Sequence, residues 1–178
     1  MPTVSIAVFG SSQASSASPH YRLAESLGRA LAKRGAIIRC GGYGGIMEGV
    51  ASGAKAEGGR VVGCTLKAFA EARTPNQYLD EVHESPDLHS RIRCLLAGTR
   101  AAVILPGGVG TLNELMWVWT LLLMDRDDGP QGLVLLGDPW KELLDFLARR
   151  FEFNEAVRSL VTVARDPDEA ARVACGVK

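Results

Sequence analysis

Short apolar runs alternate with amphipathic stretches along the whole chain. The runs are rich in β-branched residues, which is typical of strands that are buried on both faces. They fall at 4–9, 36–40, 60–66, 101–105, 132–136 and 160–164. Between them, apolar residues recur every three or four positions, and this spacing predicts amphipathic helices.

The predicted helices begin and end at residues that favour those positions. Ser18 is placed to cap the first helix, Pro19 suits its first position, and Gly35 ends it. Asp166 and Glu169 form a capping-box pattern before the last helix. Further helices are predicted through 47–54, from 87 to about 99, from near 111 to about 124, and after Asp138–Pro139.

The order of these elements predicts the fold class. Strands that alternate with helices indicate an α/β fold: a Rossmann-like, doubly wound parallel sheet with helices on both faces, in a single domain over residues 1–178. The segment 67–86 is the least regular and is expected to hold a short strand near 78–82. Ligands of such sheets bind outside the carboxyl ends of the strands. Three turns lie there: Gly10–Ser12, Gly41–Gly45 and Pro106–Thr111.

Composition narrows the classes of partner. The 178 residues are 47% hydrophobic, and 20 basic side chains balance 20 acidic ones. No overall field attracts the chain to nucleic acid or to an anionic membrane, so a bound phosphate must be held by local geometry. The apolar stretch "LMWVWTLLLM" is about half of a membrane span. We therefore expect no nucleic-acid or membrane partner.

The cysteines and the N-terminus suggest a compartment. The four cysteines are far apart and form no CxxC pair, so we expect thiols that pack as small apolar groups rather than a disulfide framework. The stretch "MPTVSIAVFGSSQ" has no basic start and only a short apolar run, unlike a signal peptide. A cytoplasmic protein is expected.

The stretch "PGGVGT", residues 106–111, carries the strongest chemical signal. It joins a buried strand to a helix, and the first N–H groups of that helix have no acceptor within it. Its three glycines allow the main chain to approach a ligand closely, and Thr111 adds a hydroxyl donor. A phosphate site is favoured over a turn in which glycine serves packing alone.

Two further glycine-rich turns are weaker signals. "CGGYGGIMEG", residues 40–49, either lines the same pocket, with Met47 at the helix start, or reflects close packing of a glycine-rich helix on the sheet. "FGSS", residues 9–12, offers N–H and hydroxyl donors at the end of the first strand. No GK[ST] follows a glycine loop, and GxGxxG does not follow the first strand, so ATP hydrolysis and hydride transfer lose support. A short loop of this kind suits a mononucleotide.

The motifs "VFGSS", "GGYGGIME", "DLHSRIR" and "LPGGVGTLNE" resemble, in order and spacing, those of the Lonely Guy (LOG) family. The resemblance covers about residues 4–165. These are nucleoside 5′-monophosphate phosphoribohydrolases, formerly described as lysine decarboxylases. The predicted phosphate- and nucleotide-binding residues are Gly10, Ser11, Gly41, Gly42, Gly44, Gly45, Met47, Pro106, Gly107, Gly108, Val109, Gly110 and Thr111.

The resemblance implies an activity and a catalytic pair. The family cleaves the N-glycosidic bond of a purine or cytokinin nucleoside 5′-monophosphate, such as AMP, to free base and ribose 5-phosphate. Its catalytic arginine and glutamate fall on Arg91 and Glu114, and Arg93 is placed to share the phosphate. A carboxylate can stabilise positive charge on the ribose ring and activate water. The family also implies a homodimer with the pocket near the subunit interface, and neither a metal nor a redox cofactor.

The chain departs from the best-studied hydrolases at two places. Ile92 follows Arg91 where those enzymes have lysine, and "GGYGGIMEG" stands where they have GGGxxGLMG. The second form is closer to molybdenum-cofactor carrier proteins, so a non-catalytic nucleotide- or cofactor-binding protein is the alternative. Lysine decarboxylation itself is not expected, because the chain has five lysines and no recognisable pyridoxal-phosphate site.

Two further features leave alternatives open. His83, Glu84, Asp87 and His89 are either a metal site or, as we favour, solvated loop side chains. In the helix that ends near 124, Trp117, Trp119 and "LLLM" cover more than one face. That pattern fits either a dimer contact or a buried core helix.

Overall fold

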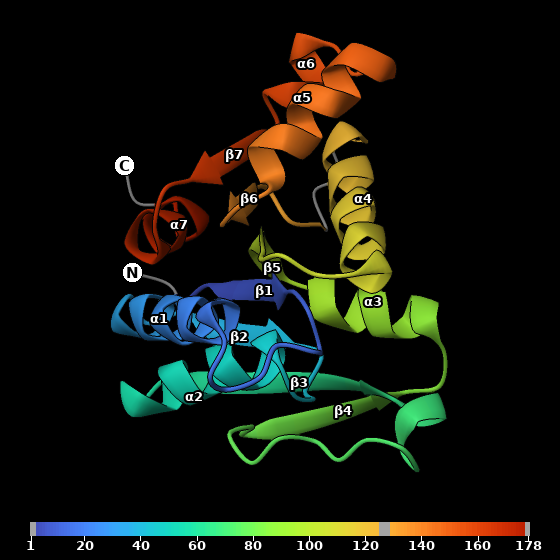
Figure 1. Ribbon diagram of the computed structural model, residues 1–178. Coiled ribbons are helices and arrows are strands. Elements are labelled where there is room, and N and C mark those ends of the chain that lie inside the picture. The colour runs from blue at the N-terminus through green and yellow to red at the C-terminus, as the bar shows by residue number, and fades with distance from the viewer. Residues whose placement is uncertain (1–2, 125–128, 177–178) are drawn as a thin grey trace.

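The computed structural model describes residues 3–124 and 129–176, and its centre is a seven-stranded parallel sheet (Figure 1). The strand order is β4-β3-β2-β1-β5-β6-β7. The strands are β1 (Ser5–Phe9), β2 (Ile37–Cys40), β3 (Arg60–Leu66), β4 (Glu81–Ser85), β5 (Thr99–Ile104), β6 (Leu133–Leu136) and β7 (Val161–Ala164). The predicted Rossmann-like α/β fold is confirmed.

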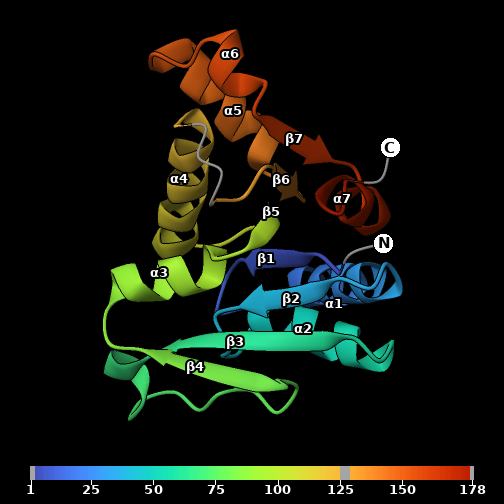
Figure 2. The ribbon, with the colours of Figure 1, turned by 180° about the vertical axis from the view of Figure 1, so that it is seen from behind.

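Helices cover both faces of this sheet, as Figures 1 and 2 show from opposite sides. The helices α1, α2 and α7 pack on one face, and α3, α4 and α5 pack on the other. Their bounds are α1 (Pro19–Lys33), α2 (Ile46–Ala56), α3 (Leu88–Leu96), α4 (Val109–Leu123), α5 (Trp140–Arg150), α6 (Glu155–Arg158) and α7 (Pro167–Ala174), with a 3₁₀ turn η1 (Lys67–Phe69). None of these helices has the length and apolar character needed to cross a membrane.

Strand β1 shows how the two faces are built. Ile6 and Val8 pack against α1 and α2, whereas Ala7 and Phe9 pack against the layer of α3 and α4. Successive side chains of a strand point to opposite faces, so a strand covered on both sides must be apolar throughout. This explains why the strands are read from the sequence as continuous apolar runs.

Most predicted elements lie within a few residues of their observed bounds, and the largest offsets, of about three residues, are at β4 and at the end of α3. The strand expected near 78–82 begins at Glu81, which pairs with Val62 of β3. Before it, the Asn76 side chain binds the Tyr43 carbonyl oxygen, and its own oxygen accepts from the Tyr78 N–H. These bonds hold 76–78 in a turn against the β2–α2 connection. The short helix α6 and the turn η1 were not predicted either, because each is too short for a periodic signal.

The sheet changes direction of winding between β1 and β5. From β1 the chain moves outward through β2, β3 and β4, and from β5 it moves outward through β6 and β7. The connections after these two central strands therefore diverge, which opens a crevice at their carboxyl ends. The turns there are joined: the Ser11 N–H donates to the Pro106 carbonyl oxygen at 3.1 Å, and the Ile46 N–H donates to the Ser11 carbonyl oxygen at 2.9 Å.

One expectation about the cysteines is wrong. Cys64 of β3 and Cys94 of α3 form a disulfide with their Cα atoms 6.2 Å apart, while Cys40 and Cys175 are free thiols. Because 30 residues separate the pair, only the packing of α3 on β3 brings the two together. The cysteines therefore do not indicate a reducing compartment.

Candidate active site

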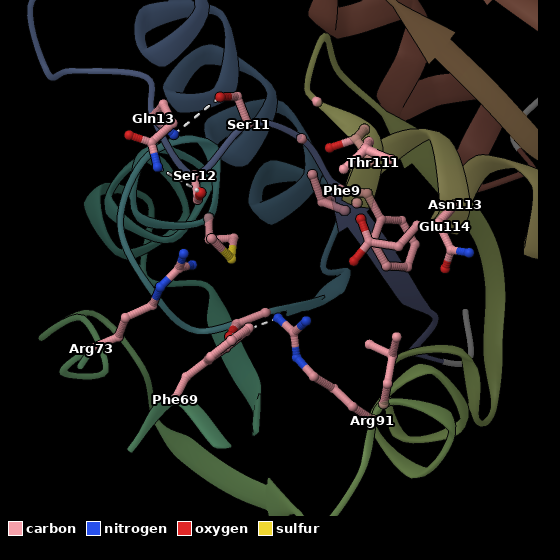
Figure 3. Close-up of a pocket in the computed structure, with 18 residues that line it drawn as sticks. Phe9, Ser11, Ser12, Gln13, Phe69, Arg73, Arg91, Thr111, Asn113 and Glu114 are labelled. Carbon is pink, nitrogen blue, oxygen red and sulfur yellow. Dashed lines mark hydrogen bonds between the residues drawn. The ribbon is translucent and has the colours of Figure 1, made fainter. Parts of the chain in front are cut away.

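A cavity of about 660 Å³ lies at the carboxyl ends of the central strands (Figure 3). Its wall comes from the turns after β1, β2 and β5, from the start of α4, from α3 and from the segment after β3. The predicted residues that line it are Gly10, Ser11, Gly41, Met47, Arg91, Gly108, Val109, Gly110, Thr111 and Glu114. Three turns that are far apart in the sequence thus contribute to one site.

Five residues of the predicted binding set do not line the cavity: Gly42, Gly44, Gly45, Pro106 and Gly107. Gly45 has a φ of +72°, and a Cβ there would overlap the Ser11 carbonyl oxygen. A Cβ on Gly107 would lie 2.9 Å from the Ser11 backbone nitrogen. These two glycines allow the turns to pack on one another, behind the surface that a ligand meets.

The cavity also has wall residues outside the predicted binding set, of which Phe9 and Ser12 belong to the "FGSS" stretch named above as a source of donors. They are Phe69 and Arg73 after β3, Gln13 and Ser12 after β1, Val8 and Phe9 of β1, Leu88 of α3 and Asn113 of α4. The segment that carries Phe69 and Arg73 has no regular pattern, so no signal in the sequence could have placed these residues at the site.

The N-terminus of α4 opens into the cavity without a side-chain cap. Gly108 is its N-cap residue and makes no capping hydrogen bond, whereas Ser18, Asp87 and Asp166 cap α1, α3 and α7. The first N–H groups of a helix have no acceptor within it, and the helix dipole adds partial positive charge. The Thr111 hydroxyl makes no hydrogen bond with the described residues. This end of the cavity is built to receive an anion.

Ser11 contributes less than its position in the sequence suggested. Its N–H is already bound to the Pro106 carbonyl oxygen, and its hydroxyl oxygen accepts from the Gln13 N–H at 3.0 Å. The hydroxyl hydrogen is therefore the donor that Ser11 can offer to a ligand.

Arg91 is held rigidly in the opposite wall. It is 8% exposed, and its Nε donates to the Cys64 carbonyl oxygen at 2.8 Å while Nη2 donates to the Gly41 carbonyl oxygen at 3.3 Å. Its guanidinium carbon lies 5.9 Å from the centre of the Tyr43 ring. Since a guanidinium has five N–H donors, these contacts leave donors for a ligand in the cavity.

Glu114 faces the same cavity from α4, one turn beyond Gly110 (Figure 3). Within the described part of the chain its carboxylate accepts no hydrogen bond. Burial raises its pKa from 4.5 to about 7, and the positive charge of Arg91 opposes that rise. A carboxyl group with such a pKa changes protonation near neutral pH, which suits a general acid or base.

The other residues raised by the sequence lie outside this cavity. Arg93 is exposed on α3, and the His89 ring packs edge-on against Trp117 with centroids 6.1 Å apart. His83 Nε2 lies 3.3 Å from a Glu81 carboxylate oxygen. Across residues 3–124 and 129–176, no three His, Cys, Asp or Glu side chains are grouped so that they could hold a metal ion.

The two tryptophans of α4 have different environments. Trp119 is buried and its Nε1 donates to the Val157 carbonyl oxygen at 3.0 Å, so it belongs to the core. Trp117 is 37% exposed on the outer side of the helix. The buried-core interpretation therefore holds for Trp119, and the exposed Trp117 leaves the dimer contact as a prediction.

The chain matches a protein-family model described as "Possible lysine decarboxylase" over residues 47–173. Among curated proteins, it is 35% identical over 119 residues to a cytokinin riboside 5′-monophosphate phosphoribohydrolase of Mycobacterium marinum. That match covers 66% of this chain and 62% of the relative, so the chain aligns with less than two thirds of that protein. A protein of the same name from Rhodococcoides fascians is 30% identical over 171 residues, covering 93% of this chain and 86% of the relative.

Among solved structures, the molybdenum cofactor binding protein of Rippkaea orientalis is similar with a TM-score of 0.76. The two chains are 20% identical, and the match covers 97% of this chain and 96% of the other. At this identity the likeness shows the fold alone.

Proposed function

This chain belongs to the LOG family, the family described as possible lysine decarboxylases, and from that premise we propose that it hydrolyses the N-glycosidic bond of a nucleoside 5′-monophosphate. The products are the free base and ribose 5-phosphate. The observation that carries the proposal is the shared cavity of an uncapped helix N-terminus, Glu114 one turn along that helix, and Arg91 opposite. The names of the curated relatives support it.

The phosphate monoester binds at the start of α4. The N–H groups of Val109, Gly110 and Thr111 and the Thr111 hydroxyl donate to its oxygens, with the Ser11 hydroxyl on the other side. A helix rises about 1.5 Å per residue, so Glu114 lies about 4.5 Å further along the axis than Thr111. This offset supports a position of its carboxylate beside the ribose.

Glu114 and Arg91 carry the reaction. The C1′–N bond breaks with its electron pair leaving on the base, and positive charge develops on the ribose ring. The Glu114 carboxylate stabilises that charge and accepts a proton from the water whose oxygen bonds to C1′. Arg91, fixed by the carbonyl oxygens of Cys64 and Gly41, stabilises the negative charge of the departing base, which then takes up a proton.

Decarboxylation of lysine finds no support in this site. The described residues that line the cavity include arginine and glutamate but no lysine to form a Schiff base with a carbonyl compound.

Incubation with AMP, followed by chromatography of adenine and a colorimetric assay for ribose 5-phosphate, tests the proposal. We expect both products in equal amounts, and loss of activity by at least about a hundredfold in Glu114→Gln. Glu142→Gln, an exposed glutamate on α5, is the matched control and should keep full activity. Undiminished cleavage by Glu114→Gln would remove Glu114 from the mechanism.

The second candidate is a carrier that binds a phosphorylated nucleotide or pterin cofactor without turnover. The "GGYGGIMEG" turn and Ile92 beside Arg91 favour it. Tight binding of nucleotides in calorimetry, with no base released from any of them, would support the carrier and exclude the hydrolase.

The outer face of α4 is the proposed contact of a homodimer. Leu112, Met116 and Trp117 lie there, each more than a third exposed. They adjoin the helix start that carries the proposed phosphate site, so the pocket lies near the subunit interface. Sedimentation should give a dimer for the wild type and a monomer for Trp117→Glu.

We also keep the cytoplasm as the proposed location, because nucleoside monophosphates are cytoplasmic metabolites. Disulfides of cytosolic proteins are usually transient, so the Cys64–Cys94 pair is expected to be partly reduced there.

A further inference from the structure

The wall of the cavity opposite the phosphate site carries an ordered stack of side chains. The Arg73 guanidinium lies over the Phe69 ring at 4.7 Å, and the Phe69 ring meets Tyr43 edge-on with centroids 6.1 Å apart. Tyr43 is anchored, because its hydroxyl accepts from the Leu66 N–H at 3.0 Å and donates to the Leu66 carbonyl oxygen at 3.3 Å. Tyr43 and Phe69 therefore fix the position from which Arg73 reaches into the cavity.

The donors of Arg73 are not used by any residue that the structure describes. No hydrogen bond or ion pair joins its guanidinium to another side chain or backbone group in residues 3–124 and 129–176. Contact with Phe69 occupies one face of the planar group and leaves its in-plane N–H donors exposed in the cavity. A half-buried cation with free donors at the wall of a ligand cavity is suited to bind the hydrogen-bond acceptors of a ligand.

The position of Arg73 indicates which part of a ligand it meets. Figure 3 shows Arg73 and Phe69 across the cavity from Thr111 and Glu114, with the Arg91 guanidinium pointing into the cavity on the side of Phe69. A nucleotide that places its phosphate at Thr111 and its C1′ atom beside Glu114 extends its base toward Arg73. Arg73 thus lies at the base end of the site and not at the phosphate end.

We propose that Arg73 selects bases that present hydrogen-bond acceptors, so that the preferred substrates are 6-oxopurine nucleoside 5′-monophosphates, such as IMP and GMP, over AMP. This inference rests on the hydrolase function proposed above. The O6 and N7 atoms of a 6-oxopurine accept two parallel bonds from a guanidinium. The 6-amino group of adenine is a donor. If it faced Arg73, the amino group and the guanidinium would both be left without an acceptor.

The test compares kcat/KM for IMP, GMP and AMP in the wild type, Arg73→Met and Arg73→Glu. We expect the wild type to favour IMP over AMP by about tenfold or more. Arg73→Met keeps the length and the packing on Phe69 but removes the donors, so the ratio should fall to about one. Arg73→Glu offers acceptors instead and should favour AMP. Arg149→Met, on the exposed side of α5, should retain the wild-type ratio.

Inhibition by ribose 5-phosphate separates the base end from the phosphate end. It should be equal in the wild type and Arg73→Met, because this product lacks a base. If Arg73→Met binds ribose 5-phosphate and all nucleotides more weakly by the same factor, Arg73 contacts the phosphate and the inference is overturned. An IMP/AMP ratio that Arg73→Met leaves unchanged would overturn it as well. Melting curves of each variant check that the fold is intact.

The same panel distinguishes the two proposals. If the wild type releases no base, the hydrolase function fails, and calorimetric affinities for IMP and AMP then decide the role of Arg73 by the same ratios. If the wild type cleaves AMP and IMP with equal kcat/KM, the hydrolase function stands and the selectivity of Arg73 is refuted. If no nucleotide binds, both proposals fail.

Discussion

Arg91 and Glu114 face one cavity from α3 and α4, and among the described residues hydrogen bonds hold the side chain of Arg91 but not that of Glu114. Two backbone carbonyl oxygens fix its guanidinium, whereas no described residue donates a hydrogen bond to the Glu114 carboxylate. Burial raises the pKa of Glu114 to about 7, and the nearby charge of Arg91 offsets part of the rise. A cation held by two hydrogen bonds therefore faces the same cavity as a carboxylate that can exchange a proton near neutral pH, as the proposed hydrolysis requires.

The pH profile of the reaction should report Glu114. If its carboxylate is the base, kcat/KM rises with pH below the Glu114 pKa of about 7 and levels off above it. Rates measured from pH 5 to 9 should show this limb in the wild type. If the residual activity of Glu114→Gln rises with pH at the same midpoint, the rise belongs to another titrating group.

Stability should depend on pH through the same residue. The folded pKa of about 7 lies above the ordinary 4.5, so the folded protein binds the proton more tightly than the unfolded chain. The stability that this binding contributes is complete below pH 4.5 and is lost as the pH rises to about 7. The loss amounts to at most about 1.4 kcal/mol for each unit of pKa shift.

Urea unfolding at pH 5 and pH 8 measures this effect. Relative to the wild type, Glu114→Gln should be more stable at pH 8 than at pH 5, because glutamine has no charge to bury. The free energy of unfolding of Glu142→Gln should differ from that of the wild type by the same amount at pH 5 and at pH 8. A pH-independent difference for Glu114→Gln would contradict the raised pKa.

The Thr111 hydroxyl should bind the phosphate. Thr111→Val keeps the shape of the buried side chain but removes its donor. A hydrogen bond to a charged group contributes about 1.5–3 kcal/mol, so KM and the inhibition constant of ribose 5-phosphate should rise by about tenfold or more. Thr120→Val, on the exposed side of the same helix, is the control. Equal constants for both variants would place the phosphate elsewhere.

Gly41 should be needed for the position of Arg91. A Cβ there would overlap Arg91 Nη2 and lie 2.6 Å from Met47 Sδ. Both atoms belong to side chains and not to the backbone, so Gly41→Ala is expected to fold while moving Arg91 out of place. Activity should fall by about tenfold or more, with a small change in melting temperature. Gly132→Ala, whose Cβ meets only the Ala101 Cβ at 3.4 Å, should retain activity.

The Cys64–Cys94 disulfide should stabilise the pairing of β3 with α3. For a separation of 30 residues, the loss of chain entropy in the unfolded state is worth about 3–4 kcal/mol. Reductant should lower the melting temperature of the wild type and of Cys175→Ser, but not that of Cys94→Ser. If reductant does not change the melting temperature of the wild type, the disulfide is absent in solution.

Local patterns in the sequence were sufficient for most of the elements. The β1 run from Ile6 to Phe9 is apolar throughout because both faces are covered, and the Ser18 side chain accepts from the Tyr21 N–H as a helix cap. The turn 106–111 carries its own signal, since glycines at the start of a helix expose N–H donors wherever the helix lies. The strand near 78–82 was misplaced because hydrogen bonds from Asn76 to a distant turn decide where β4 begins.

The sequence by itself determined the order of strands and helices, the glycine turns and, through the LOG motifs, the pair Arg91 and Glu114. These depend on residues close together in the chain or on a motif of fixed spacing. Only the tertiary structure decided that Phe69 and Arg73 form the far wall of the cavity, that Cys64 meets Cys94, and that Glu114 is buried enough to raise its pKa. Each of these depends on groups that lie close in space but far apart along the chain, and neither spacing nor composition specifies such contacts.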